Sequence, residues 1–295
     1  MKVAISGETL GSVMKLEDIL PIFKENGVNS IEIWPENIPV QVGKNIVHKR
    51  LYANRDVLKA KEILEKFDMK VACVCFGAGF DKDLAENKTL FSGELRRAVE
   101  VAAELGANVV NHYCYYVAMN DEYPLEELKG YYREAIEKAE ELKVYLALEN
   151  EAHDITKNPV RMKEIVKYMG SEYFRTNYDA TNYYQSGYEG FPYAYEILKD
   201  CIIHVHIKNG CIYMPEFGHK EACRGGEMTG ALSGKYIYYP YASDGAVNID
   251  GLLRRLIRDG YEGYCTIEPH TTPELCLQYY KEETTYLRQR NIYAE

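Results

Sequence analysis

The 295-residue sequence lacks the features that mark several large classes of protein. Its formal net charge is -10 at pH 7. A general nucleic-acid binder instead carries an excess of lysine and arginine that neutralises phosphates. No apolar run reaches the roughly 18 residues that a membrane-spanning helix needs. No basic, hydrophobic signal segment precedes MKVAISG, so we expect a cytoplasmic protein. The acidic charge and the lack of long apolar runs favour a small molecule as the partner, rather than nucleic acid or a membrane.

Two kinds of short motif are also missing. The eight cysteines form no CxxC pair, and we expect reduced thiols, with Cys73 and Cys75 as small buried side chains on one face of a strand. Neither GxGxxG nor GxxxxGK[ST] follows the first apolar run, so the phosphate-binding loops that often accompany open α/β sheets are absent.

What the sequence does contain is a regular alternation of short apolar runs and longer segments of helical period. Strict alternation favours a parallel sheet with helices outside, and eight units in this length are typical of a single (β/α)8 TIM barrel over residues 1–295. A doubly wound open sheet is the alternative fold. The eight predicted strands are residues 2–6, 29–34, 70–76, 108–113, 144–149, 175–180, 202–207 and 264–269.

One connection is far longer than the usual two to six residues of a βα loop. Residues 210–248 separate the seventh predicted strand from its helix and are rich in glycine and aromatic residues. We expect this insertion to be either a lid over the mouth of the barrel or an excursion that is flexible or contacts another subunit. If it is a lid, Arg224 and His219 are placed to grip a polar or anionic group of a substrate.

Polar side chains stand at the ends of four consecutive predicted strands. Because the C-terminal ends of parallel barrel strands meet on one face, we expect these side chains to converge. Three carboxylates and one imidazole suit Mn²⁺ best, with Mg²⁺, Co²⁺ or Zn²⁺ as alternatives. Taken singly, each residue could equally be a helix cap, an ion-pair partner or a buried core group. The predicted ligands are Glu149, Asp179, His206 and Glu268.

Further residues near the predicted mouth are candidates for substrate contacts. His204, His206 and Lys208 share one face of the seventh strand, because residues two apart point to the same side. Lys208 could polarise a substrate oxygen or pair with Asp179. The remaining candidates are His112 at the end of strand four, His153, and Trp34, whose ring could stack on a sugar or belong to the core.

Four segments resemble the xylose isomerase-like TIM barrels, in the branch of sugar phosphate isomerases and epimerases. They are LALEN (146–150), NYDATN (177–182), HVHIKN (204–209) and GYEGYCTIEPH (260–270), and the likeness covers nearly the whole chain. The resemblance assigns the metal to the same set of Glu149, Asp179, His206 and Glu268. The chain departs from many members in having Glu151 directly after the EN of strand five, with His153 two positions later. It also has Asn182 where some ketose epimerases carry a histidine, and Asn182 is a further candidate for a substrate contact.

The chemistry implied by the resemblance is proton abstraction next to a carbonyl, through a metal-stabilised enediolate. Glu149 and Glu268 would then be the two groups that remove and return the proton. This predicts an isomerase or epimerase of a sugar or polyol derivative, with homo-oligomerisation left open.

Three other functions compete with this prediction. A lyase or dehydratase of the same fold would use the same enolate for elimination, for example from a keto-sugar or 3-keto-glycoside. An apurinic endonuclease needs more histidines and a basic surface, which the sequence does not offer. A non-catalytic sugar-binding subunit would use the metal only to hold its ligand.

Overall fold

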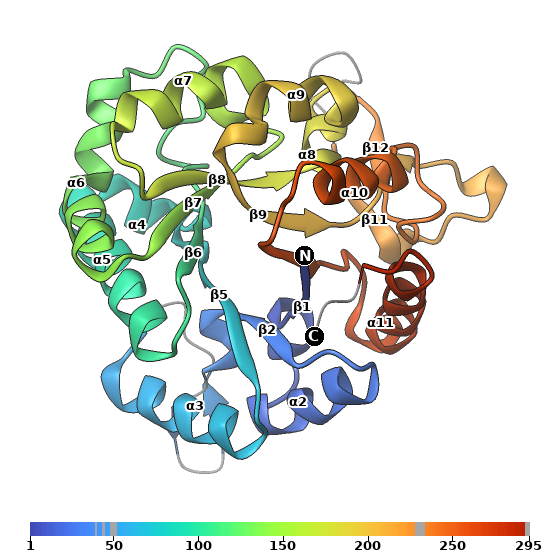
Figure 1. Ribbon diagram of the computed structural model, residues 1–295, viewed down its shortest axis with the longest axis horizontal. Coiled ribbons are helices and arrows are strands. Elements are labelled where there is room, and N and C mark those ends of the chain that lie inside the picture. The colour runs from blue at the N-terminus through green and yellow to red at the C-terminus, as the bar shows by residue number, and fades with distance from the viewer. Residues whose placement is uncertain (39, 43–44, 48–51, 228–233, 293–295) are drawn as a thin grey trace.

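The computed structural model describes residues 1–38, 40–42, 45–47, 52–227 and 234–292. Eight strands close into a barrel in the order β1-β13-β9-β8-β7-β6-β5-β2, and every neighbouring pair is parallel. The predicted (β/α)8 barrel is therefore confirmed (Figure 1). Each strand lies within two residues of its predicted run at either end. The barrel strands are β1 (Lys2–Ser6), β2 (Ser30–Ile33), β5 (Lys70–Phe76), β6 (Val109–His112), β7 (Tyr145–Glu149), β8 (Phe174–Asp179), β9 (Ile202–Ile207) and β13 (Tyr264–Ile267).

Helices surround this barrel, and local sequence signals fix where they begin and end (Figure 1). In α7 the Asn158 side chain accepts hydrogen bonds from the backbone of Val160 and Arg161, Pro159 occupies the first turn, and Gly170 ends the helix at a φ of 74°. The helices are α1 (Glu8–Gly11), α2 (Leu16–Glu25), α3 (Asn54–Lys66), α4 (Lys82–Glu86), α5 (Lys88–Glu104), α6 (Leu125–Leu142), α7 (Pro159–Met169), α8 (Ala180–Gln185), α9 (Tyr195–Leu198), α10 (Ile249–Arg258) and α11 (Pro273–Arg288).

The layer between helices and barrel is apolar, whereas part of the barrel interior is polar. The helices bury residues such as Leu95, Leu128 and Ile165 against the outer face of the strands. Inside the barrel, fully buried polar side chains come from β2, β6, β8, β9 and β13. Burying polar groups costs free energy unless each finds a partner, so an interior of this kind indicates a ligand site rather than a core built only for stability. These residues are Glu32, Asn111, Asn177, His204, His206 and Thr266.

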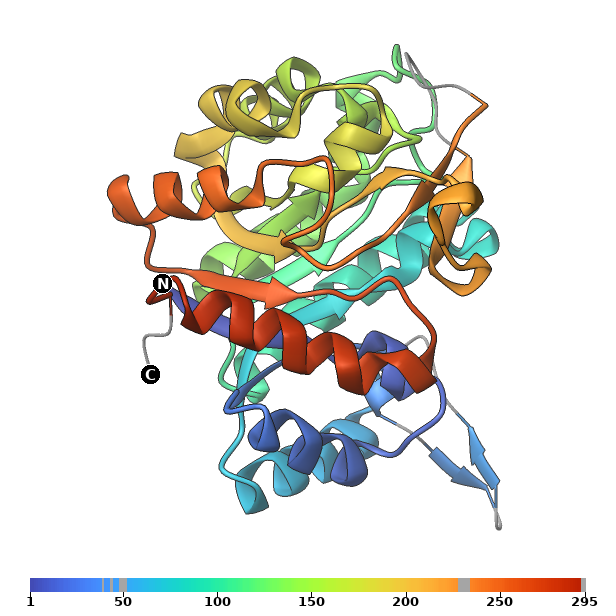
Figure 2. The same cartoon turned by 90° about the vertical axis from the view of Figure 1, so that its right-hand side faces the viewer.

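Two excursions leave the barrel at the end toward which its strands point (Figure 2). The first is an antiparallel hairpin of β3 (Val40–Val42) and β4 (Asn45–Val47). The second is the predicted insertion, whose described part folds into a sheet of β10 (Cys211–Ile212), β12 (Tyr236–Tyr238) and β11 (Arg224–Glu227). Residues 228–233 of the insertion lie outside the described residues. Its role as a lid stays a prediction.

No helix among the described residues has both the length and the apolar character needed to cross a membrane.

Candidate active site

The four side chains predicted from the strand ends meet at one rim of the barrel. One ligand atom from each of Glu149, Asp179, His206 and Glu268 lies within 4.8 Å of those of the other three. They come from the adjacent strands β7, β8 and β9 and from the residue just beyond β13. The Nδ1 atom of His206 is 3.2 Å from Oε1 of Glu149 and 3.2 Å from Oε1 of Glu268. All four side chains are buried, with at most 4% of any residue exposed.

Strand register and a helix start explain how Asp179 reaches this cluster. Asp179 is paired with His206 across β8 and β9, so the two stand at the same level of the barrel. Its Oδ1 accepts backbone hydrogen bonds from Thr181 at 2.7 Å and Asn182 at 2.9 Å, which caps α8. The Asn150 side chain binds both the backbone N–H and the carbonyl of Asp179. These contacts leave Oδ2 of Asp179 directed toward the cluster.

Three amide side chains orient Glu149. Its Oε2 accepts hydrogen bonds from Nδ2 of Asn111 at 2.8 Å and Nδ2 of Asn177 at 3.0 Å. Asn182 donates to Oε1 of Glu149 at 3.3 Å. Hydrogen bonds to an ionised carboxylate are stronger than those between neutral groups, so this carboxylate is held in one orientation. Asn111 and Asn177 were not predicted as site residues, although Asn177 shares a strand face with Asp179 and Asn111 directly precedes the candidate His112.

Lys208 balances the negative charge of the cluster. Its Nζ lies 2.9 Å from Oδ2 of Asp179 and 2.6 Å from Oε2 of Glu268. Burial alone would lower the pKa of Lys208, but Asp179 and Glu268 raise it well above its usual range. Burial likewise raises the pKa of Glu268, and the charges of His206 and Lys208 outweigh this and hold it well below its usual range. The predicted pairing of Lys208 with Asp179 is therefore present, and Lys208 pairs with Glu268 as well.

The donor atoms of the cluster fit a divalent cation. Among the described residues, Nδ1 of His206 has no hydrogen-bond partner, and the contact of Oδ2 of Asp179 is its ion pair with Lys208. Buried polar atoms normally have a hydrogen-bond partner, so a bare imidazole nitrogen that faces three carboxylates calls for a ligand. Three hard carboxylates and one imidazole nitrogen suit Mg²⁺, Mn²⁺, Co²⁺ or Zn²⁺.

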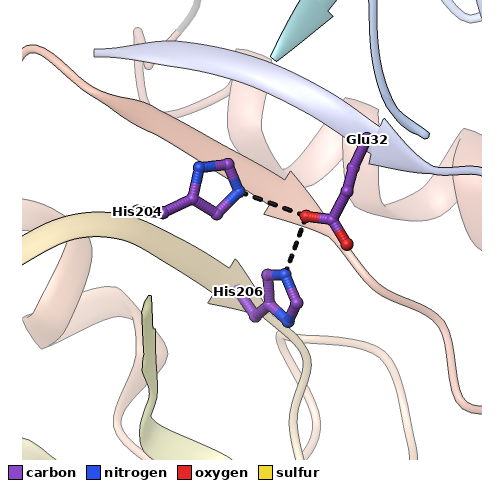
Figure 3. Close-up of side chains that lie close together, drawn as sticks. All are labelled: Glu32, His204 and His206. Carbon is purple, nitrogen blue, oxygen red and sulfur yellow. Dashed lines mark hydrogen bonds and ion pairs between the residues drawn. The ribbon is translucent and has the colours of Figure 1, made fainter. Parts of the chain in front are cut away.

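On the far side of His206 lies a buried carboxylate that the sequence analysis missed. Oε2 of Glu32, on β2, is 2.9 Å from Nε2 of His206 and 3.2 Å from Nε2 of His204 (Figure 3). All three side chains have no exposed surface. The available signal was a carboxylate between two isoleucines, in the buried run SIEI of β2.

The remaining predicted residues lie in different places. His153 is half-buried, and its Nε2 is 3.3 Å from Nε2 of Gln185. Trp34 is 5% exposed, and its Nε1 donates to Ser6 at 3.0 Å and to Oε1 of Glu32 at 3.1 Å. His219 belongs to the insertion, where its ring stacks on Tyr238.

The prediction that His112 faces the mouth of the barrel is wrong. Its ring packs against Tyr132 of α6 and Phe174 of β8, and it has no exposed surface. Side chains alternate along a strand, so the inward direction of Asn111 forces His112 outward into the apolar layer. Burial there lowers the pKa of His112 to about 3.

A pocket of about 510 Å³ opens next to the cluster. His270, in its wall, has Nε2 3.1 Å from Nζ of Lys208 and 3.5 Å from Oε2 of Glu268. Arg224 lines the pocket from the insertion, pairs with Glu221 at 2.8 Å and lies over the ring of Tyr236. The insertion thus supplies one wall of the pocket. The lining residues are Glu8, Thr9, Ser12, Glu36, Ala222, Arg224, Tyr239, Pro269, His270, Thr271 and Pro273.

With this geometry established, comparison with known proteins identifies the family. The family model described as xylose isomerase-like TIM barrel matches residues 20–290. The chain belongs to the xylose isomerase-like TIM-barrel family. No curated protein matches the sequence.

Several solved structures share the xylose isomerase-like fold over almost the whole chain. A xylose isomerase-like TIM barrel protein from Mycobacterium smegmatis in complex with magnesium has a TM-score of 0.73 at 15% identity, covering 99% of this chain and 96% of that one. The probable 3-DHS dehydratase AsbF from Bacillus anthracis has a TM-score of 0.70 at 16% identity, covering 99% and 100%. The 3-keto-D-glucoside 4-epimerase YcjR from E. coli has a TM-score of 0.69 at 15% identity, covering 98% and 99%.

Proposed function

We propose that the protein is a divalent-metal-dependent isomerase or epimerase of a sugar or polyol derivative. The observation that carries this proposal is the convergence of Glu149, Asp179, His206 and Glu268 at one buried rim of the barrel. These residues would hold the ion, with Mn²⁺ as the first choice and Mg²⁺, Co²⁺ or Zn²⁺ as alternatives. When bound, a divalent ion acts as a Lewis acid toward the oxygens of a substrate carbonyl and hydroxyl.

The proton step is assigned to Glu149 and Glu268. Each is held by partners, Glu149 by Asn111 and Asn177 and Glu268 by Lys208. A carboxylate fixed in this way can take a proton from the carbon next to a carbonyl, and the second carboxylate can return one. Acid–base catalysis of this kind typically accelerates a reaction by about 10²- to 10⁴-fold. Their burial limits contact with bulk water, which would protect an enediolate from side reactions.

Lys208 and the pocket walls supply the supporting roles. The Lys208 ammonium lies between Asp179 and Glu268, where it can stabilise negative charge that develops on a substrate oxygen. Asn182, which donates to Glu149, and His153 are proposed substrate contacts, and Arg224 is a proposed contact from the insertion. The pocket between the insertion and α1 gives the substrate access to the cluster.

The test is solvent proton exchange. Purified protein with added Mn²⁺ is incubated in D₂O with a set of keto sugars and polyol ketones, and deuterium incorporation is read by mass spectrometry after the metal is removed. We expect incorporation by the wild type and about a 10²- to 10⁴-fold loss in Glu149→Gln and Glu268→Gln. Glu164→Gln, at an exposed carboxylate on α7 that pairs with Arg161, is the control and should exchange normally. A protein that binds such ligands but exchanges no proton would be a non-catalytic binder.

A second candidate function is elimination, as in a lyase or dehydratase. The observation that favours it is His270, half-exposed in the pocket wall and 3.1 Å from Nζ of Lys208. This pair could donate a proton to a leaving group. Product mass separates the two functions, because isomerisation conserves mass and elimination loses water or an aglycone.

A further inference from the structure

Glu32 is the centre of a buried hydrogen-bond network that lies behind the proposed metal ligands. Its Oε2 faces Nε2 of His206 at 2.9 Å and Nε2 of His204 at 3.2 Å, and its Oε1 accepts from Nε1 of Trp34 at 3.1 Å. His204 also lies 2.8 Å from Oγ1 of Thr266. These contacts reach Glu32 from β9 and from just beyond its own strand. Figure 3 shows the two contacts from β9, and the Trp34 indole holds the carboxylate from a second direction.

Stability alone does not explain such a group. Removing a carboxylate from water costs several kcal/mol, and well-packed apolar residues in place of a buried ion pair are often neutral or stabilising. The neighbours of Glu32 along β2, Ile31 and Ile33, are apolar and have no exposed surface. They point to the opposite face of the strand, into the apolar layer. Glu32 is therefore the residue of this run that faces His204 and His206, and its role is tied to those hydrogen bonds.

That role follows from which nitrogen of His206 carries a proton. An ionised carboxylate only accepts hydrogen bonds, so Nε2 of His206, facing Oε2 of Glu32, must be the protonated nitrogen. In the neutral ring the lone pair then lies on Nδ1. This is the nitrogen that faces Glu149 and Glu268 at 3.2 Å each and has no hydrogen-bond partner among the described residues.

We infer that Glu32 is a positioning residue, which holds the His206 ring in the orientation and protonation that present Nδ1 to the cation. This inference rests on the metal site proposed above. A ligating histidine that donates its other N–H to a carboxylate is more basic and better oriented, and losing such a partner lowers metal affinity by about 10- to 100-fold. Trp34 acts one step further back, because its indole N–H holds the other oxygen of Glu32.

Substitution of Glu32 by glutamine tests this directly. Glutamine has nearly the same shape but only one accepting oxygen, and its amide is a donor. It must therefore place a donor against either the Trp34 indole or the histidine nitrogens. In Glu32→Gln we expect titration calorimetry with Mn²⁺ to show about a 10- to 100-fold weaker affinity than the wild type. Trp34→Phe should weaken it less, and Glu283→Gln, at a buried carboxylate away from the network, should leave it unchanged.

A spectroscopic measurement reports on His206 itself. In the zinc-loaded protein labelled with [¹⁵N]histidine, we expect the His206 ring to give a protonated Nε2 and a metal-bound Nδ1. Glu32→Gln should shift or broaden the Nε2–H signal, and the His206→Asn variant identifies which signal belongs to this ring. If the role of Glu32 were purely structural, Glu32→Gln would lower thermal stability without changing this signal or the Mn²⁺ affinity.

Three outcomes would overturn the inference, and they are distinguishable. Equal Mn²⁺ affinity in the wild type and Glu32→Gln would remove the positioning role while leaving the metal site intact. Two Mn²⁺ ions per wild-type chain, with one lost in Glu32→Gln, would make Glu32 a ligand of a second ion. Absence of Mn²⁺ and Zn²⁺ binding by the wild type would overturn both this inference and the proposed function.

Discussion

At the scale of single residues, two side chains of the site each use one polar atom for a structural contact and direct the other at the cluster. Oδ1 of Asp179 caps α8, whereas Oδ2 faces the cluster. Nε2 of His206 faces Glu32, whereas Nδ1 faces Glu149 and Glu268. In each case the structural contact fixes the rotamer and leaves the second atom pointing at the cluster. Pre-organisation of this kind reduces the ordering cost when a ligand binds.

His112 illustrates the opposite case, a titratable side chain that the site does not use. Its pKa is about 3 in the folded protein because burial disfavours the charged ring, whereas an unfolded histidine titrates near 6.5. As pH falls below about 6.5, His112 binds a proton in the unfolded state but stays neutral in the folded state. Its contribution therefore lowers the free energy of unfolding progressively toward pH 3. The penalty is absent above the unfolded pKa.

His112→Phe should therefore reduce the acid sensitivity of folding. Phenylalanine fits the aromatic surroundings of Tyr132 and Phe174. Between pH 7.5 and 5 we expect the free energy of unfolding of the wild type to fall by about 2 kcal/mol more than that of the variant. Urea denaturation at the two pH values measures the difference. Turnover should be unchanged. A tenfold loss of turnover with normal metal affinity would show that His112 does contribute to the active site.

The residues show what the sequence could predict about the site and what it could not. Glu149, Asp179, His206 and Glu268 were predictable because the ends of parallel strands always converge on one face of a barrel. His112 was misplaced because one residue of register decides whether Asn111 or its neighbour points inward. Glu32 was missed because its partners lie across the barrel, and no spacing along the chain joins it to β9.

At the scale of elements, the barrel strands were predictable and the excursions were not. The strands are short apolar runs between helical segments, and length and pattern fix them. The β3–β4 hairpin was not predicted, because its three-residue strands are too short to show a period. The insertion was recognised from its length, but its sheet of β10, β11 and β12 was not, since it depends on pairings between distant positions, such as Ile212 with Ile237, which are 25 residues apart.

Asn209 is the residue that fastens this insertion to the barrel. Its Nδ2 donates to the carbonyls of Ala242 at 2.8 Å and Val247 at 3.0 Å, and its Oδ1 accepts from the backbone of Gly210 and Val247. Alanine at this position leaves those buried backbone groups without partners, at a cost of about 1–3 kcal/mol. Because the insertion carries Arg224 and Tyr239 in the pocket wall, the loss should also loosen the pocket.

For Asn209→Ala we accordingly expect a KM several-fold higher, with Mn²⁺ affinity unchanged, measured by steady-state kinetics and calorimetry on the same preparation. The matched control is Asn158→Ala, which removes the cap of α7 and costs about 1 kcal/mol of stability without touching the pocket. A rise in KM in both variants would show that general destabilisation, not the insertion, controls substrate binding.

At the scale of the whole molecule, the four proposed ligands join four adjacent strands of one closed sheet. The barrel order places β13, β9, β8 and β7 side by side, so the ligand cluster spans half of the barrel strands. Three carboxylates held together in the interior repel one another, and Lys208 and His206 offset part of that repulsion. A divalent ion would offset more of it and tie these strands together.

Metal binding should therefore appear as global stability. An ion that binds only the folded chain stabilises it by about 2.7 kcal/mol at one hundred times its dissociation constant. For a chain of this size, that raises the thermal midpoint by roughly 5–10 °C. Scanning calorimetry of protein treated with EDTA, before and after addition of Mn²⁺, measures the shift. Glu268→Gln and Asp179→Asn should largely abolish it, whereas Glu283→Gln should retain it. If the midpoint of the wild type stays constant at saturating Mn²⁺, Mg²⁺, Co²⁺ and Zn²⁺, the cluster is not a metal site, and Lys208 and His206 alone explain how these carboxylates are tolerated inside the barrel.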